Sequence, residues 1–229
     1  MGTIVQSLLT GKIAPLGPRN APSGIDKQSV QGAIRLTHEG LYGDEQGDRR
    51  VHGGPEKAIH HYPLDHYDLW RVDIGAHSRL YVAGAFGENI STIGLDEKNV
   101  AVGDRFRFGT ALIEVSQGRQ PCWKLNARFN VPDMAMRVQK TGRTGWYYRV
   151  IEEGLAEAGE PMVLVDRLSP EWTLHRIWHL LYVDMLNYDQ LSAMATIPHL
   201  ADGWKRYAVR RLENRKVEDW SARLKGEET

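Results

Sequence analysis

The segment from residue 100 to residue 117 constrains the fold most, because it contains two alternating strands joined by a tight turn. Apolar and charged residues alternate in its first half, so one face of that strand is buried and the other is wet. Gly109-Thr110 then forms a two-residue Gly-X turn, after which the alternation resumes. The alternating apolar positions are Phe106, Phe108, Ala111, Ile113 and Val115. The chain therefore contains an antiparallel hairpin.

The rest of the first two-thirds of the chain is also rich in strands. A second hairpin is predicted between Tyr147 and Val165, with Glu153-Gly154 as its turn. Short helices are predicted to begin at Pro63 and to cover Asp133 to Lys140. Many short strands with turn glycines favour a closed or sandwich-like β architecture over a βαβ fold.

The periodicity becomes helical after Ser169-Pro170, where Ser169 is the expected cap and Pro170 the first helical residue. We therefore divide the chain into a β-rich domain, residues 1–168, and a small three-helix appendage, residues 169–229. About 60 residues cannot bury much apolar surface alone, so the appendage should pack on the β domain. The apolar stripes of its helices are Leu174, Ile177, Trp178, Leu181 and Met185; Leu191, Met194 and Ala195; and Leu200, Trp204, Tyr207, Ala208 and Leu212.

The charge balance argues against nucleic-acid and membrane partners. The chain has 229 residues, with 29 Lys and Arg against 29 Asp and Glu, so no overall field attracts a polyanion. The basic end of the third helix lacks an aromatic platform for bases. The N-terminal residues do not resemble a secretory signal, and no apolar run is long enough to span a bilayer. We expect a cytoplasmic protein.

Cys122 is the only cysteine, so it cannot form an intramolecular disulfide. Arg119 and Pro121 stand just before it, and a nearby guanidinium favours the thiolate, which attacks carbon or binds a soft metal. A small buried hydrophobe is the competing interpretation of a lone cysteine. A Cys–His pair of a thiol hydrolase is a further alternative, because such partners meet in space and not in sequence.

Three glycine-rich segments are candidates for ligand contact. Residues 43–58 contain Gly53-Gly54 and Lys57, which could present backbone N–H groups and a charge to an anion, although they do not match a P-loop. Residues 86–90 present Glu88 and Asn89, and residues 141–146 present Arg143. Each segment is also explained as an ordinary turn, loop or helix end.

Two histidine pairs are candidate ligands. His175 and His179 are four residues apart on a helix, but Arg176 occupies the place of a zinc protease glutamate and no third ligand is evident. His60 and His61 are adjacent on a strand, so at most one of them can line a site.

Three stretches together resemble the MOSC domain, named for the C-terminal domain of molybdenum-cofactor sulfurase. They are GDRRVHGGPEKAIHHY (47–62), FGENIST (86–92) and VSQGRQPCWKL (115–125). LSAMATIPHLADGWK (191–205) resembles the three-α appendage of the bacterial branch that confers resistance to 6-N-hydroxylaminopurine. The resemblance implies a β-barrel-like fold that binds molybdenum cofactor (Mo-molybdopterin) in a cleft.

The resemblance also implies roles for individual residues. Cys122 corresponds to the family cysteine and is the expected metal ligand and catalytic residue. Glu88 is expected near the metal as a proton donor. The residues expected to bind the cofactor are His52, Gly53, Gly54, Lys57, Asn89, Gln117, Arg119 and Arg143.

These roles lead to a function. The main hypothesis is an oxidoreductase that reduces N-hydroxylated bases and related compounds to amines, with the cofactor supplying the redox chemistry. Electrons must come from a separate reductase, since the chain shows no flavin fingerprint and has too few cysteines for an iron–sulfur cluster. The alternative is a carrier of cofactor or sulfur with no turnover of its own. The appendage could dock the reductase or form a homodimer.

Overall fold

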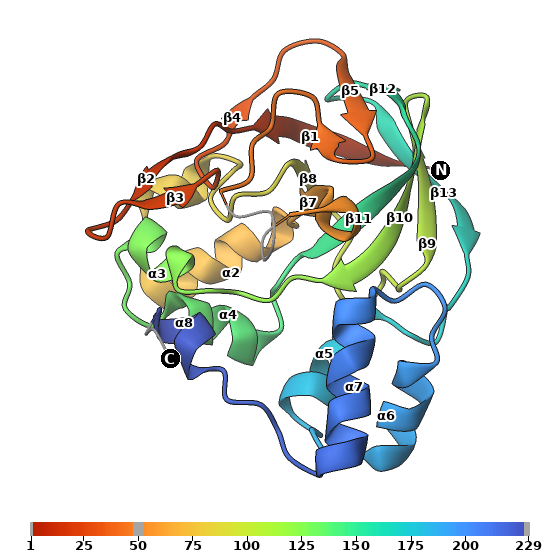
Figure 1. Cartoon of the computed structure of the whole chain (residues 1–229). Helices are drawn as coiled ribbons and strands as arrows, with labels where there is room; N and C mark the ends of the chain where they lie inside the picture. The colour runs from red at the N-terminus through yellow and green to blue at the C-terminus, as the bar shows by residue number, and fades with distance from the viewer. Residues whose placement is uncertain (1, 48–52, 227–229) are drawn as a thin grey trace.

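The computed structural model describes residues 2–47 and 53–226. Seven strands form a closed barrel in the order β13-β9-β10-β11-β7-β8-β1, and β13 pairs again with β1 to close it (Figure 1). The prediction of a mainly β, barrel-like fold with short helices is confirmed. The barrel strands are β1 (Thr3–Thr10), β7 (Ile59–His61), β8 (Ile90–Thr92), β9 (Asp104–Phe108), β10 (Ala111–Gly118), β11 (Trp146–Glu152) and β13 (Pro161–Arg167).

One predicted hairpin is confirmed and the other is wrong. β9 and β10 pair antiparallel with Ala111 opposite Phe108, around the predicted Gly109-Thr110 turn. β11 does not pair with β13, because β10 and β7 already occupy both of its edges. The residues after β11 form β12 (Gly154–Ala156), which joins β5 (Ile34–Thr37) in a separate small sheet. The remaining short strands are β2 (Ala14–Leu16), β3 (Ala21–Ser23), β4 (Gln28–Ser29) and β6 (Gly40–Leu41).

Short helices surround one end of the barrel (Figure 1). The predicted helices are present as α2 (Asp65–Ile74) and α4 (Met134–Thr141), and α4 ends at Gly142, whose φ of 74° requires a residue without a side chain. A further helix that was not predicted, α3 (Lys124–Phe129), begins two residues after Cys122. Two 3₁₀ turns, η1 (Pro55–Lys57) and η2 (Ser78–Tyr81), complete this region.

The C-terminal part contains the three predicted helices and a fourth. They are α5 (Leu174–Tyr182), α6 (Tyr188–Ala195), α7 (Asp202–Asn214) and α8 (Ser221–Lys225). The predicted start of α5 at Ser169-Pro170 is wrong: Thr173 is the cap, and its hydroxyl accepts a bond from the Arg176 N–H at 3.1 Å. After α7 the chain runs back to the barrel domain, where α8 lies beside α3 and α4 (Figure 1).

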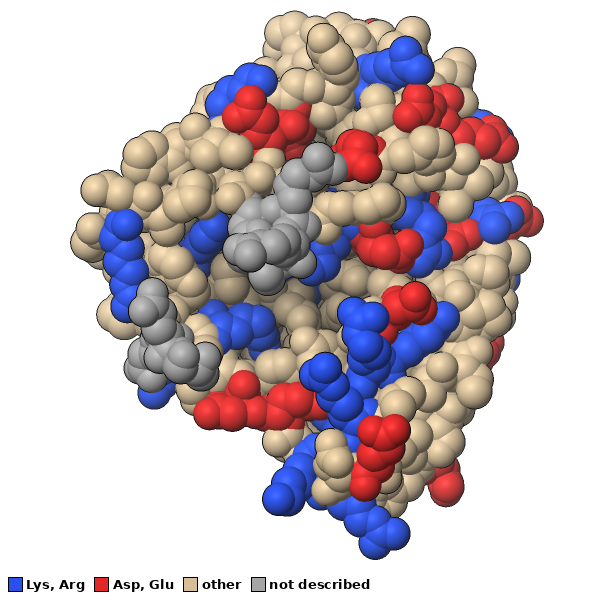
Figure 2. All heavy atoms as spheres, in the orientation of Figure 1, with Lys and Arg blue, Asp and Glu red and all other residues tan. Residues whose placement is uncertain are grey.

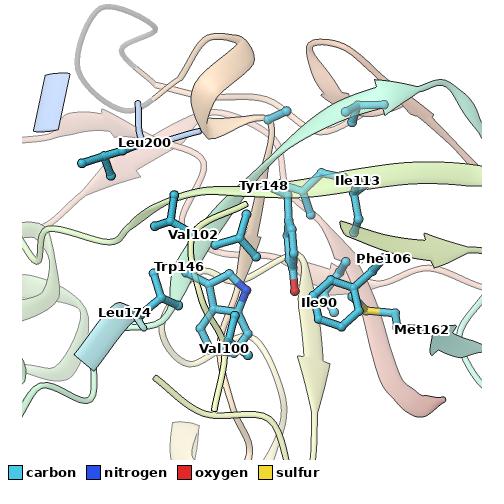
Figure 3. Close-up of a cluster of buried hydrophobic side chains, with 14 of the residues drawn as sticks. Ile90, Val100, Val102, Phe106, Ile113, Trp146, Tyr148, Met162, Leu174 and Leu200 are labelled. Carbon is cyan, nitrogen blue, oxygen red and sulfur yellow. The ribbon is translucent and has the colours of Figure 1, made fainter. Parts of the chain in front are cut away.

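The barrel and the appendage share one hydrophobic core. Figure 3 shows Trp146, Tyr148 and Ile113 of the barrel in the same cluster as Leu174 and Leu200 from the C-terminal region. The prediction that the appendage packs on the β domain is confirmed. Arg211, at the predicted basic end of α7, is fully buried and bonds Glu218 and the carbonyl of Met185, so it adds no surface charge. Within the described residues every helix is too short or too polar to cross a bilayer.

Candidate functional site

A cavity of about 90 Å³ opens beside Cys122 and collects residues from distant parts of the chain. Four of the residues singled out from the sequence line it: Lys57, Asn89, Arg119 and Cys122. His60, from the adjacent histidine pair, also lines it. Further lining residues that the sequence did not single out individually include Lys27, Asp44, Gln120, Lys124 and Tyr147. The cavity therefore unites all three signature stretches with the N-terminal segment.

Cys122 lies between the end of β10 at Gly118 and the start of α3 at Lys124. Its carbonyl accepts a hydrogen bond from the N–H of Leu125 at 2.9 Å, which ties the residue to the first turn of α3. The side chain is half-buried and forms no disulfide. A thiol held at the wall of a cavity is open to a ligand, unlike a cysteine enclosed in apolar packing.

Two cations flank this thiol. Burial lowers the pKa of Lys57, and the electrostatic influence of Cys122 opposes that shift. Arg119 is only 6% exposed, and its Nη1 has no hydrogen-bond partner among the described residues. A buried guanidinium nitrogen without a partner is costly, so this donor suits an anionic or acceptor-rich ligand.

His60 brings a second buried nitrogen without a partner to the same cavity. Burial holds the pKa of His60 well below its usual value, so the ring is neutral, and its Nε2 has no partner within the described chain. His61 points into the core, where its ring stacks on Trp146 at 4.2 Å and bonds Tyr148 and Thr92. Of the two adjacent histidines, His60 lines the cavity and His61 does not.

Tyr147 of β11 also lines the cavity. Burial raises its pKa, while the neighbouring Arg119 acts in the opposite direction. The phenol therefore keeps its proton at neutral pH and can donate a hydrogen bond. Its place next to Trp146 on β11, facing the other way, follows from strand alternation.

A buried ion pair between Lys27 and Asp44 lines the cavity. Lys27 Nζ donates to both carboxylate oxygens of Asp44, and both side chains are buried. Asn89 supports the pair by donating to Asp44 at 2.9 Å and to the carbonyl of Leu9 at 3.0 Å, while its oxygen accepts from the His60 N–H. Asn89 lines the cavity, but both N–H donors of its side chain already bond protein groups. Asp44 belongs to the glycine-rich segment 43–58, whereas nothing in the local sequence around Lys27 marks it as a site residue.

Glu88 does not line the cavity, contrary to the expected role as proton donor. Its carboxylate is fully buried and accepts bonds from the Tyr67 hydroxyl, from the N–H groups of Gly84 at 2.7 Å and Phe86 at 3.0 Å, and from Ser91 at 3.3 Å. The carboxylate therefore shapes the loop that presents Asn89. Asn89 lines the cavity, whereas Glu88 beside it is directed at the backbone of its own loop.

Arg143 also lies elsewhere. Its guanidinium pairs with Asp73 and lies 3.7 Å from the centre of the Trp70 ring, so it is engaged on the outside of α2. The remaining predicted cofactor-binding residues divide between two places. Gly53 and Gln117 line a neighbouring cleft, and Gly54, with a φ of 89°, caps the 3₁₀ turn that carries Lys57. His52 is outside the described residues.

The neighbouring cleft has a volume of about 700 Å³ and lies between the barrel and α7. It adjoins the cavity, since Lys57 and Gln120 line both. Figure 2 shows Lys and Arg gathered around this recessed face. Basic residues of the cleft are Lys57, Arg149, Lys205, Arg206 and Arg210.

No group of three or more His, Cys, Asp and Glu side chains in the described ranges could hold a metal ion alone. His175 and His179 accordingly have no third donor there. Among the described residues that line the cavity, Cys122 is the one soft donor, so it suits a metal that arrives with most of its ligands already supplied.

Comparison with known proteins supports the resemblance to the MOSC domain. Residues 48–163 match the MOSC domain, and residues 172–215 match the YiiM-like 3-alpha helix domain. Protein YiiM of Escherichia coli (strain K12) is 44% identical over 220 residues, covering 95% of this chain and 96% of that protein. A protein of Gibberella moniliformis named a reductase is 34% identical over 86% of this chain, which spans 34% of its length.

A solved structure agrees with the sequence relatives. The crystal structure of YiiM from Escherichia coli superposes with a TM-score of 0.83 and 38% identity, covering 98% of each chain. Sequence, fold and domain order therefore agree over almost the full length. This chain belongs to the MOSC-domain family, in the group that carries a YiiM-like 3-alpha helix domain.

Proposed function

We propose that the protein is a molybdenum-cofactor-dependent oxidoreductase that reduces N-hydroxylated bases and related compounds to amines in the cytoplasm. The observation that carries the proposal is the meeting of Cys122, the unpartnered Arg119 Nη1 and the unpartnered His60 Nε2 in one cavity. These groups fit an anionic pterin cofactor, which needs a soft thiolate and hydrogen-bond partners for its ring and phosphate.

Each cavity residue has a role that follows from its chemistry. Cys122 Sγ offers the protein thiolate, Arg119 donates to an anionic or ring oxygen, and neutral His60 offers Nε2 to the ring. Lys57 and Lys124 add positive charge. When bound, the cofactor supplies the two-electron chemistry that removes oxygen from nitrogen.

We assign Lys57 as the proton donor. Conversion of a hydroxylamine to an amine consumes two electrons and two protons, breaks the N–O bond and releases water. Because burial lowers the pKa of Lys57, its Nζ gives up a proton more readily than an exposed lysine does. Lys57 thus takes the role that the buried Glu88 cannot fill.

One relative supports the proposal indirectly. The fungal relative is named a reductase, and this chain corresponds to about a third of it.

The test uses protein made in a host with intact molybdenum-cofactor synthesis. Reduction of 6-N-hydroxylaminopurine is followed with an artificial electron donor, alongside molybdenum content. We expect about stoichiometric molybdenum and turnover that Cys122→Ser abolishes. Molybdenum-loaded protein without turnover would instead identify a cofactor carrier, and labile sulfur on Cys122 would identify a sulfur carrier.

A further inference from the structure

The C-terminal helix α8 contacts the residues on both sides of Cys122. The guanidinium of Arg223 donates a hydrogen bond to the carbonyl of Pro121, and the carbonyl of Arg223 accepts one from the Trp123 N–H at 2.8 Å. A single residue therefore restrains the backbone immediately before and after the cysteine. The two neighbouring peptide groups fix where the thiol can point.

α8 is itself anchored to the helices that follow the cysteine. Arg223 Nη2 donates to Gln139 Oε1 of α4 at 2.5 Å, and Asn126 Nδ2 of α3 donates to the carbonyl of Leu224 at 2.9 Å. Gly226 ends α8 with a φ of 73° and packs so closely on Trp123 that an added Cβ would lie 2.7 Å from the indole. α8 therefore has little freedom to shift.

The appendage holds the same loop from the other side. Gln120 donates to the Tyr182 hydroxyl of α5 at 3.1 Å and accepts from the Tyr207 hydroxyl of α7 at 3.3 Å. The loop 119–123 is thus fixed by α5, α7 and α8 together, although all three follow it in the chain by about 60 to 100 residues.

We propose that Arg223 is a positioning residue for Cys122 and that α8 serves as a C-terminal strap on the cysteine loop. Residues 220–226 lie outside both matched family regions, which end at 163 and 215. The effect on turnover rests on the proposed function, whereas the effect on thiol access does not require any cofactor. Catalytic groups must be held within a fraction of an ångström, and a loop without regular structure needs such restraints.

The first measurement is the rate of Cys122 alkylation by iodoacetamide in metal-free protein. The reaction is run at about pH 10, where most thiols are ionised, so that the rate reports access. Arg223→Ala should react at least about threefold faster, because the loop opens more often. Arg223→Lys should fall between, since lysine keeps the charge but lacks the two separate donor nitrogens that reach Pro121 and Gln139. Lys225→Ala, exposed on the same helix, is the matched control and should react like the wild type.

The second measurement is the kinetics of cofactor-loaded protein. Arg223→Ala should lower kcat about tenfold while KM changes less than about twofold, the pattern of a misplaced catalytic group. Circular dichroism shows whether each variant folds; if Arg223→Ala does not fold, Arg223→Lys decides by the same criteria.

The outcomes separate the two proposals. A folded Arg223→Ala protein with wild-type alkylation rate and kcat overturns the positioning role. Faster alkylation in a protein whose wild type has no turnover supports the strap and sinks the proposed function.

Discussion

Arg119 shows how a single side chain can reveal a ligand site. Its backbone N–H donates to the Gly145 carbonyl at 2.9 Å, yet its buried Nη1 has no partner among the described residues. A buried charged donor left unsatisfied costs at least about 1–3 kcal/mol. The protein tolerates that cost at the wall of a cavity that also holds the cysteine.

Replacing this guanidinium should weaken cofactor retention. A hydrogen bond to a charged group contributes about 1.5–3 kcal/mol, so Arg119→Gln should raise the dissociation constant of molybdopterin by about tenfold or more. Cofactor content after dialysis measures this. Arg107→Gln, which removes a surface pair with Glu152, is the control and should retain the cofactor. Equal retention by both variants would remove Arg119 from the site.

His61 predicts how stability depends on pH. Burial lowers its pKa from 6.5 to about 3, so between these values the unfolded chain binds a proton that the folded chain does not. Stability from this group is complete above pH 6.5 and is lost as the pH falls toward 3. Between pH 7 and pH 5 the free energy of unfolding should drop by about 2 kcal/mol from His61 alone.

Urea denaturation at both pH values measures this effect. His61→Gln should be less stable than the wild type at pH 7, because the ring bonds Tyr148 and Thr92, but should lose less stability on acidification. His179→Gln, an exposed histidine, should keep the wild-type acid sensitivity. An unchanged pH slope in His61→Gln would contradict the assignment.

At the scale of elements, the contact between β10 and α7 joins the barrel to the appendage. Gly118 ends β10, and a Cβ added there would lie 2.9 Å from Cη2 of Trp204 on α7. The indole is buried against the strand, so the two elements can approach only because Gly118 has no side chain.

Gly118→Ala should therefore destabilise the protein by about 1–3 kcal/mol, the usual cost of overpacking. Chemical denaturation measures the change, and Trp204→Phe in the same chain should recover part of it because the clashing atom is gone. Gly203→Ala is the matched control: its Cβ meets nothing closer than 3.6 Å within α7, so it should be neutral or stabilising by up to about 1 kcal/mol. A neutral Gly118→Ala would contradict the tight packing.

The elements that sequence predicted are those with local signals. β9 and β10 have alternation and a turn, and α4 has a glycine end, so their spans follow from neighbours in the chain. The false hairpin between β11 and β13 fails because strand pairing depends on which edges are free, and β11 finds both partners far away. α3, with only six residues, is too short to show a period.

At the scale of the whole molecule, the site is assembled by barrel closure. The signature stretches identified Cys122, Lys57, Arg119 and Asn89, all of which line one cavity. They could not show which residues within a stretch line the cavity, and Glu88 does not. Arg143 lies outside the three stretches, and it pairs with Asp73 instead of lining the cavity. Lys27 reaches the cavity only through the tertiary fold, because it lies outside every stretch that the sequence singled out.

The proposed function depends on Cys122 being a ligand of molybdenum. X-ray absorption at the molybdenum edge reports whether its sulfur binds the metal. Wild-type protein and Cys122→Ser are compared after expression in a host that makes the cofactor. We predict that any metal retained by the Ser variant has one sulfur neighbour fewer than in the wild type. An identical sulfur shell in fully loaded Cys122→Ser would contradict the account.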